Sequence, residues 1–85
     1  MAKKYVYPYT PQKIASKMQA RQRGLILSLA ATPAPLGTNM VLAERLAVPT
    51  TLRQPLVLKT VARGDYLYSL TDLGLRVQAL LRAAQ

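Results

Sequence analysis

The sequence lacks cysteine, histidine, tryptophan and phenylalanine, and it contains only three acidic residues, Glu44, Asp65 and Asp72. Without thiolate or imidazole groups it has no ordinary zinc site, no cysteine nucleophile and no Ser-His catalytic pair. A mechanism that uses two carboxylates would have to draw on those three acids, and neither glycine-rich phosphate-binding motif is present. We therefore expect a protein that is not an enzyme and that needs no cofactor.

The absence of cysteine also excludes a disulfide framework, which is consistent with a reducing compartment. One uncharged stretch, Gly24 to Ala43, is similar to a membrane segment, but prolines interrupt it. Its purely apolar part, Leu25 to Ala31, is far shorter than a bilayer requires. The pattern favours a buried helix followed by a loop, in a cytoplasmic protein that makes no contact with a membrane.

Positive charge is plentiful. The 85 residues include 12 lysines and arginines, which give a net charge of +9 at pH 7. Half of these cations lie before Gly24, where the chain has no acidic residue. Hydrophobic residues make up 51% of the chain, which is too many for a disordered tail, and the length allows one compact domain. The charge predicts an anionic partner such as nucleic acid.

The chain divides into an N-terminal arm, residues 1–10, and a single domain, residues 11–85. The arm is basic and rich in tyrosine, with the residues Lys3, Lys4, Tyr5, Tyr7 and Tyr9. Its tyrosines alternate with other residues, which is typical of an extended chain. They either pack on the domain as large apolar side chains with one polar tip, or grip nucleic acid or a partner subunit.

The first helical signal is the pair Thr10-Pro11, which supplies a capping hydroxyl and a proline suited to the first helical position. Apolar residues then recur at helical spacing: Ile14, Met18, Leu25 and Leu29. Gly24 lies either inside one long helix or between two shorter ones. The helical segment ends near Ala31, because the prolines that follow cannot continue it.

Two further helices are expected. Thr38 or Asn39 can cap a helix from Met40 to Ala47, with Glu44 and Arg45 outside. Its inward residues are expected to be Val41, Leu42 and Leu46, with Val48 as a further candidate. Thr71-Asp72 caps the last helix, Asp72 to Ala84. A strand from Tyr66 to Leu70 precedes it.

The segment from Leu52 to Ala62 fits two structures. As a helix it begins after Thr51 and runs to about Lys59 or Arg63, with Pro55 tolerated in its first turn. As a strand, Leu56 to Ala62 is rich in β-branched residues and pairs with Tyr66 to Leu70 across a tight turn. We favour the helix.

Three features together resemble the winged-helix regulators of bacteria, phages and archaea. The segment Leu42-Ala43-Glu44-Arg45-Leu46-Ala47-Val48 is similar to the first helix of a helix-turn-helix. The distance from Val48 to Gly64 matches a turn plus a recognition helix. The segment Tyr68-Ser69-Leu70-Thr71-Asp72-Leu73-Gly74 resembles the Tyr-x-Leu-Thr-x-x-Gly that closes the wing and opens the last helix. The resemblance covers residues 20 to 84 and implies a mainly α fold with a small β-wing (α+β), the winged helix-turn-helix.

Two positions depart from the family pattern, because Thr60 stands where an apolar residue is usual and Pro55 is uncommon in a recognition helix. The resemblance implies that this third helix enters the major groove with its N-terminal residues toward the bases. On this chain those residues are Thr50, Thr51, Arg53 and Gln54, with Arg53 suited to guanine and Gln54 to adenine. Contacts to phosphate would come from the wing, the first helix and the arm: Lys59, Arg63, Lys13, Lys17, Arg21, Arg23, Lys3 and Lys4. Alternatively, these cations are solvated surface charges and the two threonines only cap the helix.

The last helix carries an apolar stripe made of Leu73, Val77, Leu80, Leu81 and Ala84. The stripe either completes the core of the monomer or pairs with a second copy, as the terminal helices do in many winged-helix regulators. We expect a homodimer that uses this stripe, and a twofold protein predicts a palindromic site.

The leading hypothesis is a sequence-specific double-stranded DNA-binding protein, a small homodimeric transcriptional regulator that is nucleoid-associated when bound. The alternative is a winged-helix protein-interaction module, such as a phage- or plasmid-type protein that binds a host polymerase or replication factor. Binding to RNA or the ribosome is a third hypothesis, although the chain lacks the aromatic sheet of an RNA-recognition fold.

Overall fold

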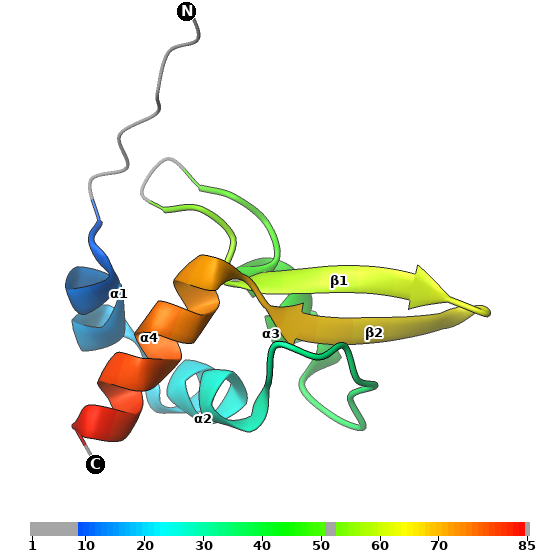
Figure 1. Ribbon diagram of the computed structural model, residues 1–85, viewed down its shortest axis with the longest axis horizontal. Coiled ribbons are helices and arrows are strands. Elements are labelled where there is room, and N and C mark those ends of the chain that lie inside the picture. The colour runs from blue at the N-terminus through cyan, green and yellow to red at the C-terminus, as the bar shows by residue number, and fades with distance from the viewer. Residues whose placement is uncertain (1–8, 51–52, 85) are drawn as a thin grey trace, which may run out of the picture.

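The computed structural model describes residues 9–50 and 53–84. This part of the chain forms a small α+β domain with four helices and a two-stranded antiparallel sheet (Figure 1). The elements are α1 (Pro11–Lys17), α2 (Ala20–Ser28), α3 (Met40–Leu46), β1 (Val57–Ala62), β2 (Asp65–Leu70) and α4 (Asp72–Ala83). Among the described residues, no helix combines the length and the apolar character needed to cross a membrane.

The N-terminal helical segment is broken in two. Thr10 caps α1 as predicted, because its hydroxyl accepts a hydrogen bond from the Lys13 backbone N–H at 3.2 Å. The break lies at Met18 and Gln19, which are both extended, whereas Gly24 lies inside α2. Gln19 and Gln22 form a capping box that starts α2. The apolar residues predicted to face inward are all buried: Ile14, Met18, Leu25 and Leu29.

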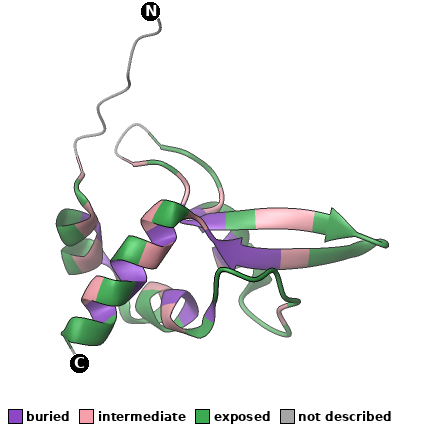
Figure 2. Ribbon diagram, viewed as in Figure 1, coloured by how far each residue is buried: buried purple, intermediate pink, exposed green. Residues whose placement is uncertain are grey.

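The core lies where α4 crosses α1 and α2 and meets the base of the hairpin (Figure 2). Val77 of α4 and Ile26 of α2 are fully buried there. The amide Nε2 of buried Gln78 donates to the carbonyls of Ile26 and Leu29, at 2.9 and 2.7 Å. The C-terminal carbonyls of a helix lack partners within it, so Gln78 closes the end of α2 inside the core.

The apolar stripe of α4 completes this core. Val77 and Leu81 are 0% and 7% exposed, and Leu73 packs against the same cluster. Leu80 is half-buried and Ala84 is exposed just beyond the helix. The buried members therefore contribute to the core of the monomer, while Leu80 and Ala84 keep exposed surface, and a dimer interface along the stripe stays a prediction.

The predicted second helix is present as α3, but its orientation differs from the prediction. Asn39 occupies the N-cap position with a left-handed backbone, φ 62°, and its side chain makes no capping hydrogen bond. Leu46 is buried and Leu42 packs against the core as predicted, but Val41 and Val48 are 66% and 56% exposed, and Ala43 is the other buried residue. The preceding loop is extended at Ala34, which forms a bridge with Tyr68 of β2.

The predicted helix from Leu52 to Lys59 or Arg63 is wrong, because β1 occupies Val57–Ala62. The alternative of a strand paired with Tyr66–Leu70 is the one observed. The two strands join through Arg63 and Gly64, whose φ angles of 52° and 81° make the twisted two-residue turn that hairpins favour. Pairing buries Val57 against Leu70. This long-range contact and the β-branched residues outweigh the local helical pattern.

A compact joint connects the hairpin to α4. The Thr71 hydroxyl accepts from the Gly74 N–H at 3.1 Å and donates to the Pro55 carbonyl at 2.7 Å. The Thr71 N–H donates to the Leu56 carbonyl at 3.1 Å. A Cβ on Gly74 would lie 2.1 Å from that same Leu56 oxygen. The Tyr-x-Leu-Thr-x-x-Gly segment thus supplies a buried strand end, a helix cap and a residue small enough for close approach.

Candidate nucleic-acid interface

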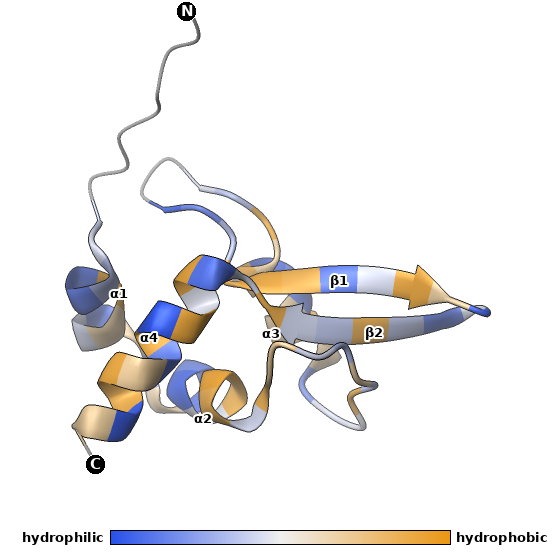
Figure 3. Ribbon diagram, in the orientation of Figure 1, coloured by the Kyte–Doolittle hydropathy of each residue, from blue (hydrophilic) through white to orange (hydrophobic). Residues whose placement is uncertain are grey.

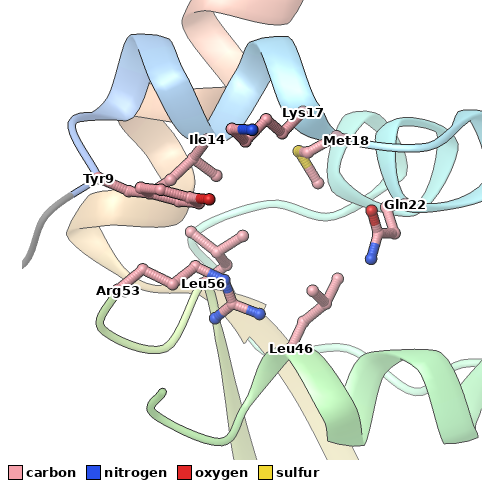
Figure 4. Close-up of a pocket in the computed structure, with 8 residues that line it drawn as sticks. All are labelled: Tyr9, Ile14, Lys17, Met18, Gln22, Leu46, Arg53 and Leu56. Carbon is pink, nitrogen blue, oxygen red and sulfur yellow. The ribbon is translucent and has the colours of Figure 1, made fainter. Parts of the chain in front are cut away.

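A small hollow lies between α1, the start of α2 and the residues that precede β1 (Figure 4). Its volume is about 100 Å³. Its apolar lining consists of Ile14, Met18, Leu46 and Leu56. Its polar lining consists of Tyr9, Lys17, Gln22 and Arg53. We call this space the Arg53 hollow.

The Arg53 guanidinium lies beside Leu56 and reaches toward Leu46 inside the hollow (Figure 4). A turn holds its backbone, since the Arg53 N–H donates to the Thr50 hydroxyl at 3.1 Å and the Thr50 N–H donates to the Arg53 carbonyl at 3.0 Å. Burial lowers the pKa of Arg53 below its usual range, because desolvation penalises the charged guanidinium. Arginine nevertheless stays charged in proteins.

No carboxylate neutralises this partly buried charge within the described chain. Across residues 9–50 and 53–84 the single ion pair joins Lys59 to Glu44. The side chain of Arg53 makes one weak contact, from Nη1 to the Gln54 carbonyl at 3.3 Å. A guanidinium held in a partly apolar hollow without an anionic partner is suited to bind an anion from outside.

The other polar groups of the hollow are also donors. The Nζ of Lys17 lies 5.7 Å from the ring centre of Tyr9, and the Nζ of Lys13 lies 5.3 Å from it. The Oε1 of Gln22 accepts from the Gln19 N–H at 3.0 Å. The Gln22 amide nitrogen and the Tyr9 hydroxyl both point into the space beside Arg53 (Figure 4).

A second hollow adjoins the first, because Gln22 lines both. It is lined by two arginines from different helices, by amide side chains and by apolar residues: Arg21, Arg45, Gln19, Gln22, Asn39, Val41 and Leu42. Among the residues that the structure describes, no carboxylate lines either hollow. Lys13 lines neither hollow, but it lies over the ring of Tyr9, which lines the first. We call the surface that carries Lys13, Lys17, Arg21, Arg45 and Arg53 the basic face.

Three of the cations predicted to bind DNA lie away from the basic face. Arg23 is exposed on α2 and lines neither hollow. Lys59 bonds to Glu44 at 2.5 Å and lies 4.0 Å from the ring centre of Tyr66. Arg63 is exposed at the hairpin tip.

Of the residues predicted for base contacts, Thr50, Arg53 and Gln54 are described, and none of these three lies on a helix. Thr50 stabilises the turn before Arg53, and Gln54 is exposed between that turn and β1. Thr51, like Lys3 and Lys4, lies outside the described residues. Gln22 and Arg45 were not predicted from the sequence as members of the site, whereas Tyr9 belongs to the arm for which contact with nucleic acid was one of two alternatives. Arg45 follows Leu42 by three residues, so helical spacing alone places both on one side of α3.

The arrangement is suited to hold phosphate groups. Guanidinium and ammonium groups make charge-assisted hydrogen bonds to phosphate oxygens. The amide of Gln22 and the phenol of Tyr9 are further hydrogen-bond donors beside them. No family model matches the chain, and no curated protein or solved structure shows significant similarity to it. The chemistry of the basic face therefore carries the functional argument.

Proposed function

We propose that this protein binds double-stranded DNA and that the basic face contacts the phosphate backbone of the DNA. The observation that carries the proposal is Arg53, a partly buried guanidinium in a donor-lined hollow without a carboxylate partner among the described residues. A phosphate seated there restores the hydrogen bonds that burial removes from the guanidinium. The adjoining hollow offers Arg21 and Arg45 to a further phosphate.

We further assign the domain to the winged-helix type. The hairpin, the bridge between Ala34 and Tyr68, and the capped α4 that follows are compatible with that fold. The described residues between α3 and β1 contain no recognition helix. Direct reading of bases by a third helix is therefore not part of the proposal, and we expect affinity to depend only weakly on sequence.

The test is the binding of a fluorescent DNA duplex measured by anisotropy over a salt series. Affinity of the natural protein should fall steeply as salt rises, because phosphate contacts release counterions. Arg53→Gln should weaken binding about tenfold and reduce the salt slope by about 1, with the same loss on unrelated sequences. Arg82→Gln is the matched control. It removes the same charge from the exposed last turn of α4 and should change affinity much less.

Two outcomes contradict the proposal. Equal losses for Arg53→Gln and Arg82→Gln would reduce the effect to net charge, with no site at Arg53. Absence of duplex binding at low salt would exclude the function altogether. In that second case, co-purification with a protein partner would favour the protein-interaction module, and retention of an RNA hairpin would make RNA the ligand.

A further inference from the structure

The exposed large hydrophobic side chains gather on one half of the molecule. All of those in the described chain lie on α3, on the hairpin or on the loop that follows α3: Met40, Val41, Val48, Leu58, Val61 and Tyr66. Figure 3 shows hydrophobic colour over most of β1, although the hairpin projects away from the core. Two of these side chains, Leu58 and Val61, lie on β1 itself, and alternation along the strand places them on opposite faces of the hairpin.

The two edges of the hairpin differ. The outer edge of β2 is occupied, since Tyr68 and Ala34 exchange two hydrogen bonds at 2.8 and 3.0 Å and the Leu70 N–H donates to Ala30 at 2.8 Å. Among the described residues, no strand pairs with the outer edge of β1. β1 is therefore an open strand edge, which is a template for another strand.

The register determines which backbone groups β1 presents. Tyr68 and Leu70 direct their backbone groups away from β1, so their cross-strand partners Lys59 and Val57 direct theirs outward as well. Backbone direction alternates along a strand, so Val61 also faces outward, whereas Thr60 faces β2. The exposed part of β1 thus offers the N–H and C=O groups of Lys59 and Val61 to a new strand.

We propose that β1 pairs antiparallel with β1 of a second copy of this chain, with the twofold axis at Thr60. In this register Lys59 and Val61 of the two copies exchange four backbone hydrogen bonds. Thr60 lies opposite the partner's Thr60, which is a favourable cross-strand pair, and Leu58 lies opposite the partner's Ala62. The two hairpins become one continuous sheet. This inference stands on the hairpin and does not rest on the proposed binding of DNA.

The local charge beside β1 fits a second copy as the occupant of this edge, although the net charges of the two chains repel each other. A groove lies beside the first residues of β1, and the ion pair between Lys59 and Glu44 leaves it without net charge. A groove without net charge suits an apolar strand such as β1 of a second copy. Glu44, with Val48 and Pro55, lines the groove beside the first residues of β1. The antiparallel register brings the partner's Arg63 to this end of the strand, close to the half-exposed Glu44 carboxylate. Because α1 and α2 lie at the opposite end of the molecule from the hairpin tip, the two basic faces stay apart (Figure 1).

Cross-linking tests the register directly. The natural chain has no cysteine, so a Thr60→Cys variant can form only one disulfide, between two copies. Residues that face each other without hydrogen bonds in an antiparallel pair have Cα atoms about 4.5 Å apart, which is within disulfide range. We expect rapid oxidation to a covalent dimer that keeps the natural circular dichroism spectrum. Val41→Cys on α3 and Leu80→Cys on α4 are the controls and should remain largely monomeric under the same conditions.

Sedimentation equilibrium supplies a second measurement that needs no cysteine. In the proposed register, Val61→Lys places a lysine opposite the partner's Lys59, and the symmetry repeats this like-charge pair in the other copy. The repulsion should raise the dimer dissociation constant by about tenfold or more. Val41→Lys adds the same charge at an equally exposed position and should change the dimer dissociation constant little.

Raising the salt concentration should strengthen the dimer, because two chains of +9 repel each other. A natural protein that sediments as a monomer at all concentrations overturns the proposal. So does a dimer that is cross-linked through position 80 and not through position 60.

Discussion

The helices α1, α2 and α4, which we call the helical body, differ from the hairpin half, formed by α3, β1 and β2. The helical body buries its apolar stripes against one another and shows cations to solvent. The hairpin half buries the base of its sheet and one side of α3, and it leaves large apolar side chains exposed. Among the described residues, the large hydrophobic side chains that remain exposed lie on this half or on the loop that follows α3.

This difference separates two kinds of partner. The basic face lies mostly on the helical body and is suited to phosphate, an interaction that salt weakens. The hairpin edge is suited to another strand, an interaction that salt strengthens when both partners are cationic. Under the two proposals, one domain of this size holds a polyanion on one side and a second copy of itself on the other. The predictions that follow act on the joint between the two halves, then on each half separately.

The largest effect is expected at the joint, from Gly74→Ala. The new methyl group would lie 2.1 Å from the Leu56 carbonyl oxygen and 3.1 Å from a methyl group of Leu70. The backbone must move, and we expect a loss of about 3 kcal/mol in the free energy of unfolding. Chemical denaturation measures it. Gly24→Ala is the control: it lies within α2 with open space around it and should stabilise the protein by about 0.5–1 kcal/mol. Equal effects at the two glycines would contradict the close contact at the joint.

The next effect concerns the helical body alone. Gln78→Met keeps the approximate volume of the side chain but leaves the Ile26 and Leu29 carbonyls without their buried donor. We expect destabilisation of about 2 kcal/mol, measured by chemical denaturation. Gln12→Met, at an exposed position of α1, should change stability by only a few tenths of a kcal/mol. A neutral Gln78→Met would show that water replaces the amide at the end of α2.

A smaller effect of opposite sign is expected in the hairpin. Arg63 holds a left-handed backbone, φ 52°, which costs a residue other than glycine about 1–2 kcal/mol and costs asparagine less. Arg63→Asn should therefore stabilise the protein by about 0.5–1 kcal/mol, seen as a higher melting temperature. Arg63→Val places a β-branched residue at the same positive φ angle and should lower the melting temperature. The duplex affinity should change little in either variant, because Arg63 lies at the tip, away from the basic face.

The helical body was predictable because its signals are local. Two capping pairs act within one helical turn: Thr10 with Pro11, and Thr71 with Asp72. Each pair begins a helix at the predicted position. The helical pattern allowed one long helix or two helices divided at Gly24, because glycine is a weak helix former. The chain forms two helices, but the capping box of Gln19 and Gln22 places the boundary before Ala20.

The hairpin half was harder, because β1 depends on partners in β2 and local propensity permitted a helix from Leu52 onward. The candidate site shows the same limit. Lys17 and Arg53 were each singled out as cations, but only the tertiary fold brings them to one hollow. Buried residues such as Leu46 and Leu56 form the apolar walls of that hollow. The positions of the charged residues in the sequence do not show which apolar residues are buried beside them.

The smallest predicted effect is a pH dependence at the contact between α3 and β1. The hydrogen bond to Glu44 raises the pKa of Lys59 above its usual value, and the nearby tyrosines add to the rise. A raised lysine pKa means that the contribution to stability is complete below about pH 10.4 and is lost as the pH rises through the higher folded value. The melting temperature should therefore fall more steeply in this alkaline range for the natural protein than for Glu44→Gln. Asp65→Asn removes the same charge from the hairpin without touching Lys59, and its profile should run parallel to that of the natural protein. Parallel profiles for all three proteins would mean that solvent screens the pair completely.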